Sequence, residues 1–538
     1  MPLNQIPPPS AALVDLKSGL ADQYWYDYFN GLRTSTTTTP PPTPTDPDVF
    51  RPEDYGGGPA VADNLAAFQA MATAMRTRGC GRIEFECNAT YTFCVTPPAP
   101  GTIVFDLSGC SGFEVNFNGA KLVTPALYYD NVFSLSTNAG STLALASSFV
   151  GAALGYEVIS SSVIATTTIS NIVGSTITLS LPATRTGAFQ AAYRPGPNDG
   201  KYLYGIVLND CTKWKINHPH FEHTNASFAQ VLDPYAGLHA LSIGDGCVDG
   251  EIGGSLRLVG GSIGIEVVRS NGWTEAKRSR NLRLSSDTNW SFYGTMLERN
   301  GDACEVKIKT DHVGRSGGCY GCNGNTFYVD SQGGDGFDDF LITSLSDPAD
   351  TFVQSATSGI RAFYRWRPSP TAVAAKGTLI DLGFRNAVPA SPQNCLLRNV
   401  KIFFDVDGTG TATTNHPGTI IQFIGAALPV SGTHFMQDIE ISGTAFNMDG
   451  TTNLANVFND VDWSSVHRRA VVFSSITAYS GGAGNFFNID GLGLEPGVVK
   501  FRDVNSLFPI IPSNVTATHL VYDNTQFSNL PYAGSYTT

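Results

Sequence analysis

The chain has 538 residues, of which 15% are charged, with 56 glycines, 32 phenylalanines and a formal net charge of −13. The low charged fraction and the abundance of Gly, Ser, Thr and Asn favour strands and turns over helices. The negative charge argues against nucleic acid and anionic membranes as partners, since both are polyanions. No apolar run approaches the roughly 20 residues of a membrane span, so we also expect no membrane insertion.

The first 34 residues predict a short helical segment. Residues 10–32 have apolar side chains at helical spacing, with Ser10 as the N-cap and Gly31 at the end. The helix carries more aromatic side chains than one exposed helix can bury, among them Tyr24, Trp25, Tyr28 and Phe29. We expect these rings to contact another copy of the chain or a different protein. Docking onto the chain's own body is the alternative.

Residues 35–49 are rich in proline and threonine, which predicts an extended linker. A larger body begins at about residue 50. Its first element is an amphipathic helix that Asp63 can cap and Gly79 can end. A strand follows, in which Ile83, Phe85 and Cys87 alternate with charged residues.

The order of these motifs resembles the entrance of the pectate-lyase-like β-helix superfamily, which includes bacteriophage tail spikes and tail fibres. The segments that carry the resemblance are Tyr55-Gly56-Gly57, Asp63-Asn64-Leu65-Ala66-Ala67-Phe68-Gln69-Ala70, Gly79-Cys80-Gly81-Arg82-Ile83-Glu84-Phe85 and Thr90-Tyr91. One departure is the stretch 58–62, which replaces the usual Asp-Gly pair.

The resemblance implies an all-β fold, a right-handed parallel β-helix, which we place over residues 50–505. Residues 506–538 are proline-rich and irregular, so we expect a C-terminal cap there, with a trimer clasp as the alternative. The resemblance also implies a homotrimer that is part of the virion and assembles in the host cytoplasm. Residues 1–34 would attach to phage tail, baseplate or portal-adaptor proteins, and the body would bind host surface polysaccharide. No cofactor is expected. Residues 132–190 look like strands joined by small-residue turns, and resemble the small β insertion found early in phage spikes.

A weak repeat supports the solenoid. Gly205, Gly237 and Gly264 each open an apolar run that a polar turn follows, at spacings typical of solenoid coils. Asn217 and Asn281 fall near the expected corners, where amide side chains tolerate unusual backbone angles.

Paired carboxylates are the candidates for catalysis. Asp249 and Glu251 would share one side of a strand about 7 Å apart, with Asp245 on the preceding turn, as the hydrolysis of a glycoside requires. A second group consists of Glu298, Asp302, Glu305 and Asp311. Solvated surface carboxylates are the alternative for both groups.

Aromatic rings near polar groups are the candidates for sugar binding. The rings we select are Trp273, Trp290, Tyr293, Tyr364 and Trp366. Strand alternation places Tyr364 and Trp366 on one side and Arg365 and Arg367 on the other. The basic run 277–280 is a further candidate contact for an acidic glycan. Burial at a subunit contact is the alternative for the aromatic rings, and solvent exposure for the basic run.

A metal site is not expected. His218, His220 and Glu222 would share one side of a strand, but their spacing matches no known metal motif. Cys319 and Cys322 lack a second ligand pair. We expect the single cysteines to be buried thiols: Cys87, Cys211, Cys247 and Cys395.

The functional hypothesis is attachment to the host surface. A polysaccharide depolymerase on the same scaffold, either a hydrolase or a lyase, and a purely structural virion or baseplate protein remain alternatives.

Overall fold

The computed structural model describes these residues: 48–96, 99, 101–125, 132–147, 154–160, 162–163, 167–184, 186–194, 202–224, 237–268, 277–332, 339–346, 356–369, 377–386, 396–409, 417–424, 434–446, 456–461, 466–479, 485–490, 499–507, 510–513, 520–528, 530–533 and 536–537. The predicted helix at 10–32, its aromatic residues Tyr24, Trp25, Tyr28 and Phe29, and nearly all of the linker lie outside them. Among the described residues, no helix is long and apolar enough to cross a membrane.

The body begins with the predicted helix. After β1 (Val49–Phe50) and the 3-10 helix η1 (Pro52–Tyr55), helix α2 spans Leu65–Arg78 and ends at Gly79, whose φ is 84°. The N-cap position is Asn64 rather than the predicted Asp63, but the Asp63 carboxylate, one residue earlier, accepts a hydrogen bond from the Leu65 amide at 3.0 Å. Phe68 on the helix contacts the rings of Phe85, Tyr91 and Phe105, so the buried side of α2 covers the first coils.

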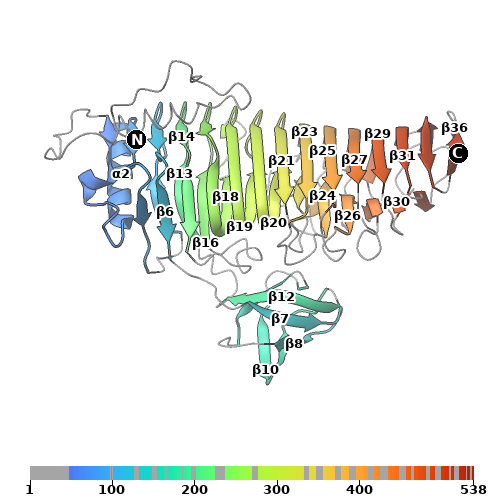
Figure 1. Cartoon of the computed structure of the whole chain (residues 1–538), viewed down its shortest axis with the longest axis horizontal. Coiled ribbons are helices and arrows are strands. Elements are labelled where there is room, and N and C mark those ends of the chain that lie inside the picture. The colour runs from blue at the N-terminus through green and yellow to red at the C-terminus, as the bar shows by residue number, and fades with distance from the viewer. Residues whose placement is uncertain are drawn as a thin grey trace, which may run out of the picture. The chain divides into compact units, whose positions relative to one another are not determined.

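The coils form two long ladders of parallel strands, shown side by side in chain order in Figure 1. Ladder 1 consists of β2 (Arg82–Glu84), β5 (Glu114–Asn116), β14 (Lys215–Asn217), β17 (Glu251–Gly253), the first halves of β19 (Arg283–Glu298) and β20 (Glu305–Tyr320), β21 (Thr326–Gln332), β23 (Ala356–Arg367), β25 (Leu396–Asp407), β27 (His434–Phe446), β29 (Val466–Tyr479), β31 (Val499–Ser506) and β33 (Leu520–Asp523).

Ladder 2 consists of β4 (Ile103–Asp106), β13 (Tyr202–Leu208), β16 (Gly237–Ile243), the second halves of β18 (Leu256–Val267), β19 and β20, then β22 (Phe340–Ser346), β24 (Thr378–Asn386), β26 (Thr419–Ile424), β28 (Asn456–Val461), β30 (Asn485–Asp490) and β32 (Ile510–Ser513). A third, short ladder is formed by β3 (Thr90–Thr92), β6 (Lys121–Thr124), β15 (His220–His223) and the first residues of β18. From β19 onward it merges into the strands of ladder 1.

These ladders establish the predicted right-handed parallel β-helix. One apolar cluster runs through the coils, from Phe50 and Phe68 to Tyr522 and Phe527. The parallel pairing continues past the predicted boundary at residue 505, because β31 still pairs with β33. Antiparallel pairs then end the described chain: β34 (Thr525–Phe527), which still pairs in parallel with β31, pairs with β35 (Leu530–Ala533), and β33 pairs with β36 (Tyr536–Thr537).

The small β insertion is confirmed, and its strands run from residue 132 to 194. It is a separate six-stranded antiparallel sheet of β7 (Val132–Thr137), β8 (Leu143–Ser147), β9 (Glu157–Ser160), β10 (Ile169–Val173), β11 (Thr176–Leu179) and β12 (Gly187–Arg194). The insertion has its own apolar core, which includes Leu135, Ile177 and Leu179.

One corner of the β-helix is made by single residues in the left-handed backbone conformation. These residues are in register from coil to coil just before ladder 1, and we call them the corner column: Gly112, Lys213, Asp249, Asn281, Ala303, Gly324, Gly359, Asn399, Asp438 and Ala470. Glycine, asparagine and aspartate predominate because they tolerate positive φ best. The prediction for Asn281 is therefore confirmed. Asn217 also lies next to a corner, since it ends β14 before His218, whose φ is 49°, and its side-chain amide donates a hydrogen bond to that of Asn116 in the adjacent coil at 2.5 Å.

Candidate functional site

The outward side of ladder 1 carries exposed aromatic rings in register. Tyr328, Phe363 and Phe403 occupy equivalent positions on β21, β23 and β25, and they are 43%, 45% and 46% exposed. We call them the aromatic column. The rings of Tyr328 and Phe363 stack face to face, with centroids 5.1 Å apart and planes 8° apart. Large apolar rings in an exposed row are candidates for ligand contact.

Charged residues flank this column on both sides. Two residues before it along the strands, Lys401 pairs with Glu440 at 2.8 Å. Two residues after it, Lys309 pairs with Asp287 at 3.3 Å, and Arg365 lies 3.7 Å from Asp330. The aromatic rings are therefore bordered by groups that donate and accept hydrogen bonds.

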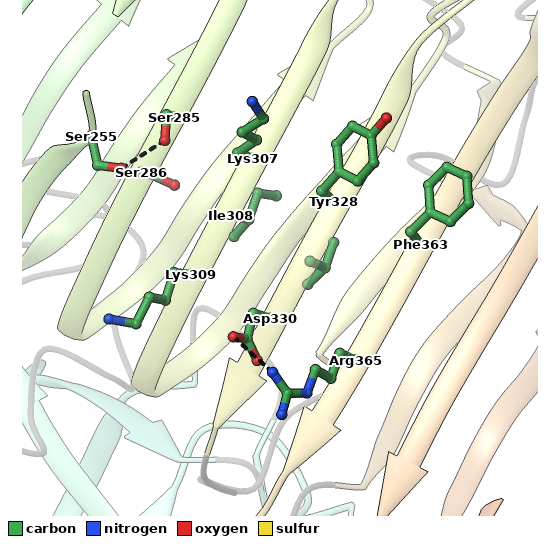
Figure 2. A pocket seen from close by; sticks show the side chains of 11 residues that line it. Ser255, Ser285, Ser286, Lys307, Ile308, Lys309, Tyr328, Asp330, Phe363 and Arg365 are labelled. Atoms are coloured by element: carbon green, nitrogen blue, oxygen red, sulfur yellow. Dashed lines mark hydrogen bonds and ion pairs between the residues drawn. The ribbon is translucent and has the colours of Figure 1, made fainter. Parts of the chain in front are cut away.

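A pocket of about 410 Å³ lies where the aromatic column begins (Figure 2). We call it the Tyr328 pocket, and its lining is Ser255, Ser285, Ser286, Lys307, Ile308, Lys309, Tyr328, Val329, Asp330, Phe363 and Arg365. The hydroxyls of Ser255 and Ser285 are 2.7 Å apart. The pocket arises because the small Ser285 and the large Tyr328 are separated by a single coil, which contributes Lys307 between them. Its volume lies within the usual range for small-molecule sites.

A second hollow of about 440 Å³ contains the predicted carboxylates. Asp249 and Glu251 both line it, and Glu305 of the second predicted group joins them. We call it the carboxylate hollow. Asn281 donates a hydrogen bond to Asp249 at 3.1 Å, and Arg283 lies 3.7 Å from Glu251. The pair of Lys307 and Glu305, at 3.1 Å, links the linings of the two hollows.

The third predicted carboxylate does not join this site. Asp245 is 4% exposed in the turn before β17, and it does not line the carboxylate hollow. The positive φ of Asp249, 55°, gives that residue a structural role in the corner column as well.

The aromatic rings selected from the sequence lie elsewhere. Tyr364 and Trp366 are buried at 1% and 0% exposure, so their prediction as glycan contacts is wrong. The predicted alternation of side chains along the strand is correct, but Tyr364 and Trp366 are on its inner side. There the Tyr364 hydroxyl donates a hydrogen bond to the buried Asp339 at 2.7 Å. Trp273 lies outside the described residues.

Trp290 and Tyr293 remain partly exposed but are not in the aromatic column. Trp290 is at the corner between the two ladders, with φ 54°, and its indole stacks on His312 at 4.3 Å. Tyr293 is on ladder 2 and accepts a hydrogen bond from Arg315 at 3.2 Å. Neither lines the Tyr328 pocket, so their role as glycan contacts stays a prediction.

A buried polar cluster lies on ladder 2. His239 Nδ1 is 3.3 Å from Glu266 Oε1, and the Glu298 carboxyl group accepts a hydrogen bond from Tyr320. Burial alone would raise the pKa of Glu266, but the charge of His239 and hydrogen bonds from His239 and Ser242 hold it below its ordinary value. Burial, together with the neighbouring charge of Glu266, raises the pKa of Glu298.

The remaining candidates have structural contacts. Arg278 of the basic run donates hydrogen bonds to Asp302 at 3.0 Å and to the Gly321 carbonyl at 2.8 Å. Glu222 pairs with Lys121 at 3.2 Å and lies 3.7 Å from His220.

The thiols follow the prediction in part. Cys211, Cys247, Cys319 and Cys322 are buried, as expected of small apolar side chains. Cys87 is exposed, which corrects its prediction, because the strand ends at Glu84 and the chain has already turned. Cys395 lies outside the described residues.

The architecture places the chain among parallel β-helix proteins. No protein-family model matches its sequence, and neither does any curated protein. Among solved structures, an exopolygalacturonase from Thermotoga maritima is 11% identical, with 91% of this chain and 95% of that chain covered and a TM-score of 0.43. A mutant tailspike protein of E. coli bacteriophage HK620, in complex with a pentasaccharide, is 10% identical, with 89% and 76% covered and a TM-score of 0.44. The tailspike of Pseudomonas phage phi297 is 11% identical, with 84% of each chain covered and a TM-score of 0.25.

Sequence reasoning missed the aromatic column. The signal available was local: in Thr326–Asp330 the apolar Phe327 and Val329 alternate with Tyr328, which leaves the tyrosine on the polar side. Phe363 and Phe403 occupy the same position in their own strands.

Proposed function

We propose that the protein is a phage tail spike or tail fibre that attaches the virion to its host by binding surface polysaccharide at the Tyr328 pocket. The observation that carries the proposal is the exposed aromatic column beside a pocket lined by charged and hydroxyl groups. Sugars present apolar ring faces and hydroxyl edges, so a site that combines a ring with polar groups suits them.

The support for the proposal comes from the chain's own surface and from the sequence motifs at residues 55–91. The ligands of the similar solved structures are no part of that support, since those chains are only 10–11% identical. The proposed oligomeric state and the proposed attachment to the virion follow from the resemblance of the sequence motifs to phage tail spikes. The protein forms a homotrimer in the virion, and residues 1–34 attach it to tail, baseplate or portal-adaptor proteins. The aromatic rings of that segment make the attachment.

Two measurements on the full chain and on a variant without residues 1–34 test the proposal. Both proteins are expected to bind host cells and extracted surface polysaccharide, and only the full chain is expected to join particles. A purely structural virion protein would show no binding to cells in either form. Mass determination is expected to give a trimer, and a stable monomer would contradict that part.

The carboxylate hollow favours a second candidate function, cleavage of the bound polymer. It contains Asp249, Glu251 and Glu305 next to the Tyr328 pocket, and glycoside hydrolysis uses two carboxyl groups. The test is to incubate the protein with host polysaccharide and determine the size of the products. A hydrolase would shorten the polymer, and E251Q or D249N would abolish this. Asparagine tolerates the positive φ of position 249, so D249N should preserve the fold.

A further inference from the structure

We infer that the Tyr328 pocket takes a sugar unit that carries an anionic group, either a carboxylate or a phosphate. This inference rests on the proposed function and specifies the ligand class of that same site. Three observations support it: the excess of cations in the lining, the exposure of the ion pairs that Lys307 and Lys309 make, and the Asp330 carboxylate.

The lining has three cations and one carboxylate. Lys307, Lys309 and Arg365 face Asp330 alone, in a chain whose formal net charge is −13. The carboxylates that pair with the two lysines, Glu305 and Asp287, are not part of the lining, so an anionic group in the pocket would meet more cations than carboxylates.

Lys307 and Lys309 can exchange their carboxylate partners for an anionic group of a ligand. Their ion-pair partners, Glu305 and Asp287, do not line the pocket. The side chains of Lys307 and Lys309 are 61% and 59% exposed. Ion pairs this exposed contribute little to stability, so an incoming anion can replace the carboxylate partner at little cost.

Asp330 is a hydrogen-bond acceptor in the pocket lining. Arg365 lies against one of its oxygens, Oδ2, at 3.7 Å. The other oxygen, Oδ1, is buried and has no hydrogen-bond partner among the described residues. The Asp330 side chain as a whole is 38% exposed, so its accessible part can accept a hydrogen bond from a sugar hydroxyl. Figure 2 shows Lys307 beside Tyr328 and Asp330 on the strand of Tyr328, so ring, cation and acceptor belong to one pocket.

The test compares one polymer in three forms. Acidic surface polysaccharide is extracted from a host strain, and one portion is carboxyl-reduced while another is dephosphorylated. Binding of each form to the full-length protein is measured by calorimetry at two salt concentrations. We expect at least one of the two treatments to weaken binding about tenfold or more, and the form that is affected identifies the anionic group. Binding of the native form should also weaken with salt.

Matched variants locate the effect. K307M and K309M retain most of the apolar stem and remove the charge, and each should weaken binding of the native polymer about fivefold. K401M is the control, since Lys401 is on the same side of ladder 1 and 58% exposed but does not line the pocket. Equal binding of the native, carboxyl-reduced and dephosphorylated polymers overturns the inference and leaves the proposed function intact. An effect of K401M as large as that of K307M and K309M also overturns it. If the wild type binds none of the polymers, the proposed function fails and the inference with it.

Discussion

Replacing Tyr328 with alanine is expected to weaken polysaccharide binding substantially without unfolding the protein. The Tyr328 ring forms one wall of the pocket and stacks on Phe363 at 5.1 Å. The residue is 43% exposed, and a tyrosine side chain offers about 200 Å² of surface, so a ligand can cover at most about 90 Å² of it. At about 25 cal/mol per Å², full coverage contributes about 2 kcal/mol, which corresponds to about 30-fold in Kd.

The assay is calorimetric titration of the full-length wild type and of Y328A with surface polysaccharide. We expect Kd to rise by about 5- to 30-fold, because a sugar covers half or more of the exposed ring. Y328F should stay close to the wild type if the ring face is the main contact. Thermal unfolding of each variant verifies that the fold persists.

The matched control is F403A. Phe403 is 46% exposed and belongs to the same column, but it does not line the pocket. Its removal should change Kd by less than about twofold if one pocket carries the binding. A Kd within twofold of the wild type for Y328A would refute the assignment of the pocket. Equal losses for Y328A and F403A would instead indicate contact along the whole column.

Three further predictions concern the body. The pKa of Glu298 is raised in the folded protein, so this group favours folding below its ordinary pKa and loses that contribution as pH rises through the folded pKa. E298Q should therefore raise the Tm near pH 7 and change it little near pH 4, as followed by calorimetry. Because Trp366 is fully buried, W366A should lower the free energy of unfolding by about 3–5 kcal/mol in denaturant titrations, and normal stability would contradict its position. Ala303 has φ 54°, so A303G should gain about 0.5–1 kcal/mol, and a measured loss would show that the corner is not strained.

Much of the fold was predictable because its signals are local. The helix at Leu65–Arg78 depends on an acidic residue at its start, Asp63, a stop at Gly79 and apolar spacing, all of which lie within a few turns. The pairing of Ile216 with Ile252 follows from a repeat of similar apolar runs. Such patterns determine which side of each strand enters the core, since every coil must bury it against the next.

The proposed binding surface was less predictable because it depends on the register between coils. In β23 both sides of the strand carry large side chains, so the alternation alone does not decide which side faces inward. The charged Arg365 side chain faces outward, where the carboxylate of Asp330 on the adjacent coil lies 3.7 Å away. That neighbour is known only once the strands are aligned. Tyr364 is acceptable inside the core for a similar reason, since its hydroxyl finds Asp339.

The columns also explain why a hollow forms at one place on a regular surface. In a parallel ladder, each outward side chain has an equivalent neighbour about 4.8 Å away on the next coil. Where those neighbours have similar size, as Tyr328 and Phe363 do, they stack and close the surface. Where the size changes, as from Ser285 through Lys307 to Tyr328, the larger ring stands above the smaller side chain and leaves a pocket beside it. The proposed ligand surface is thus formed by residues that contribute little to the core, so its chemistry can change without changing the coil.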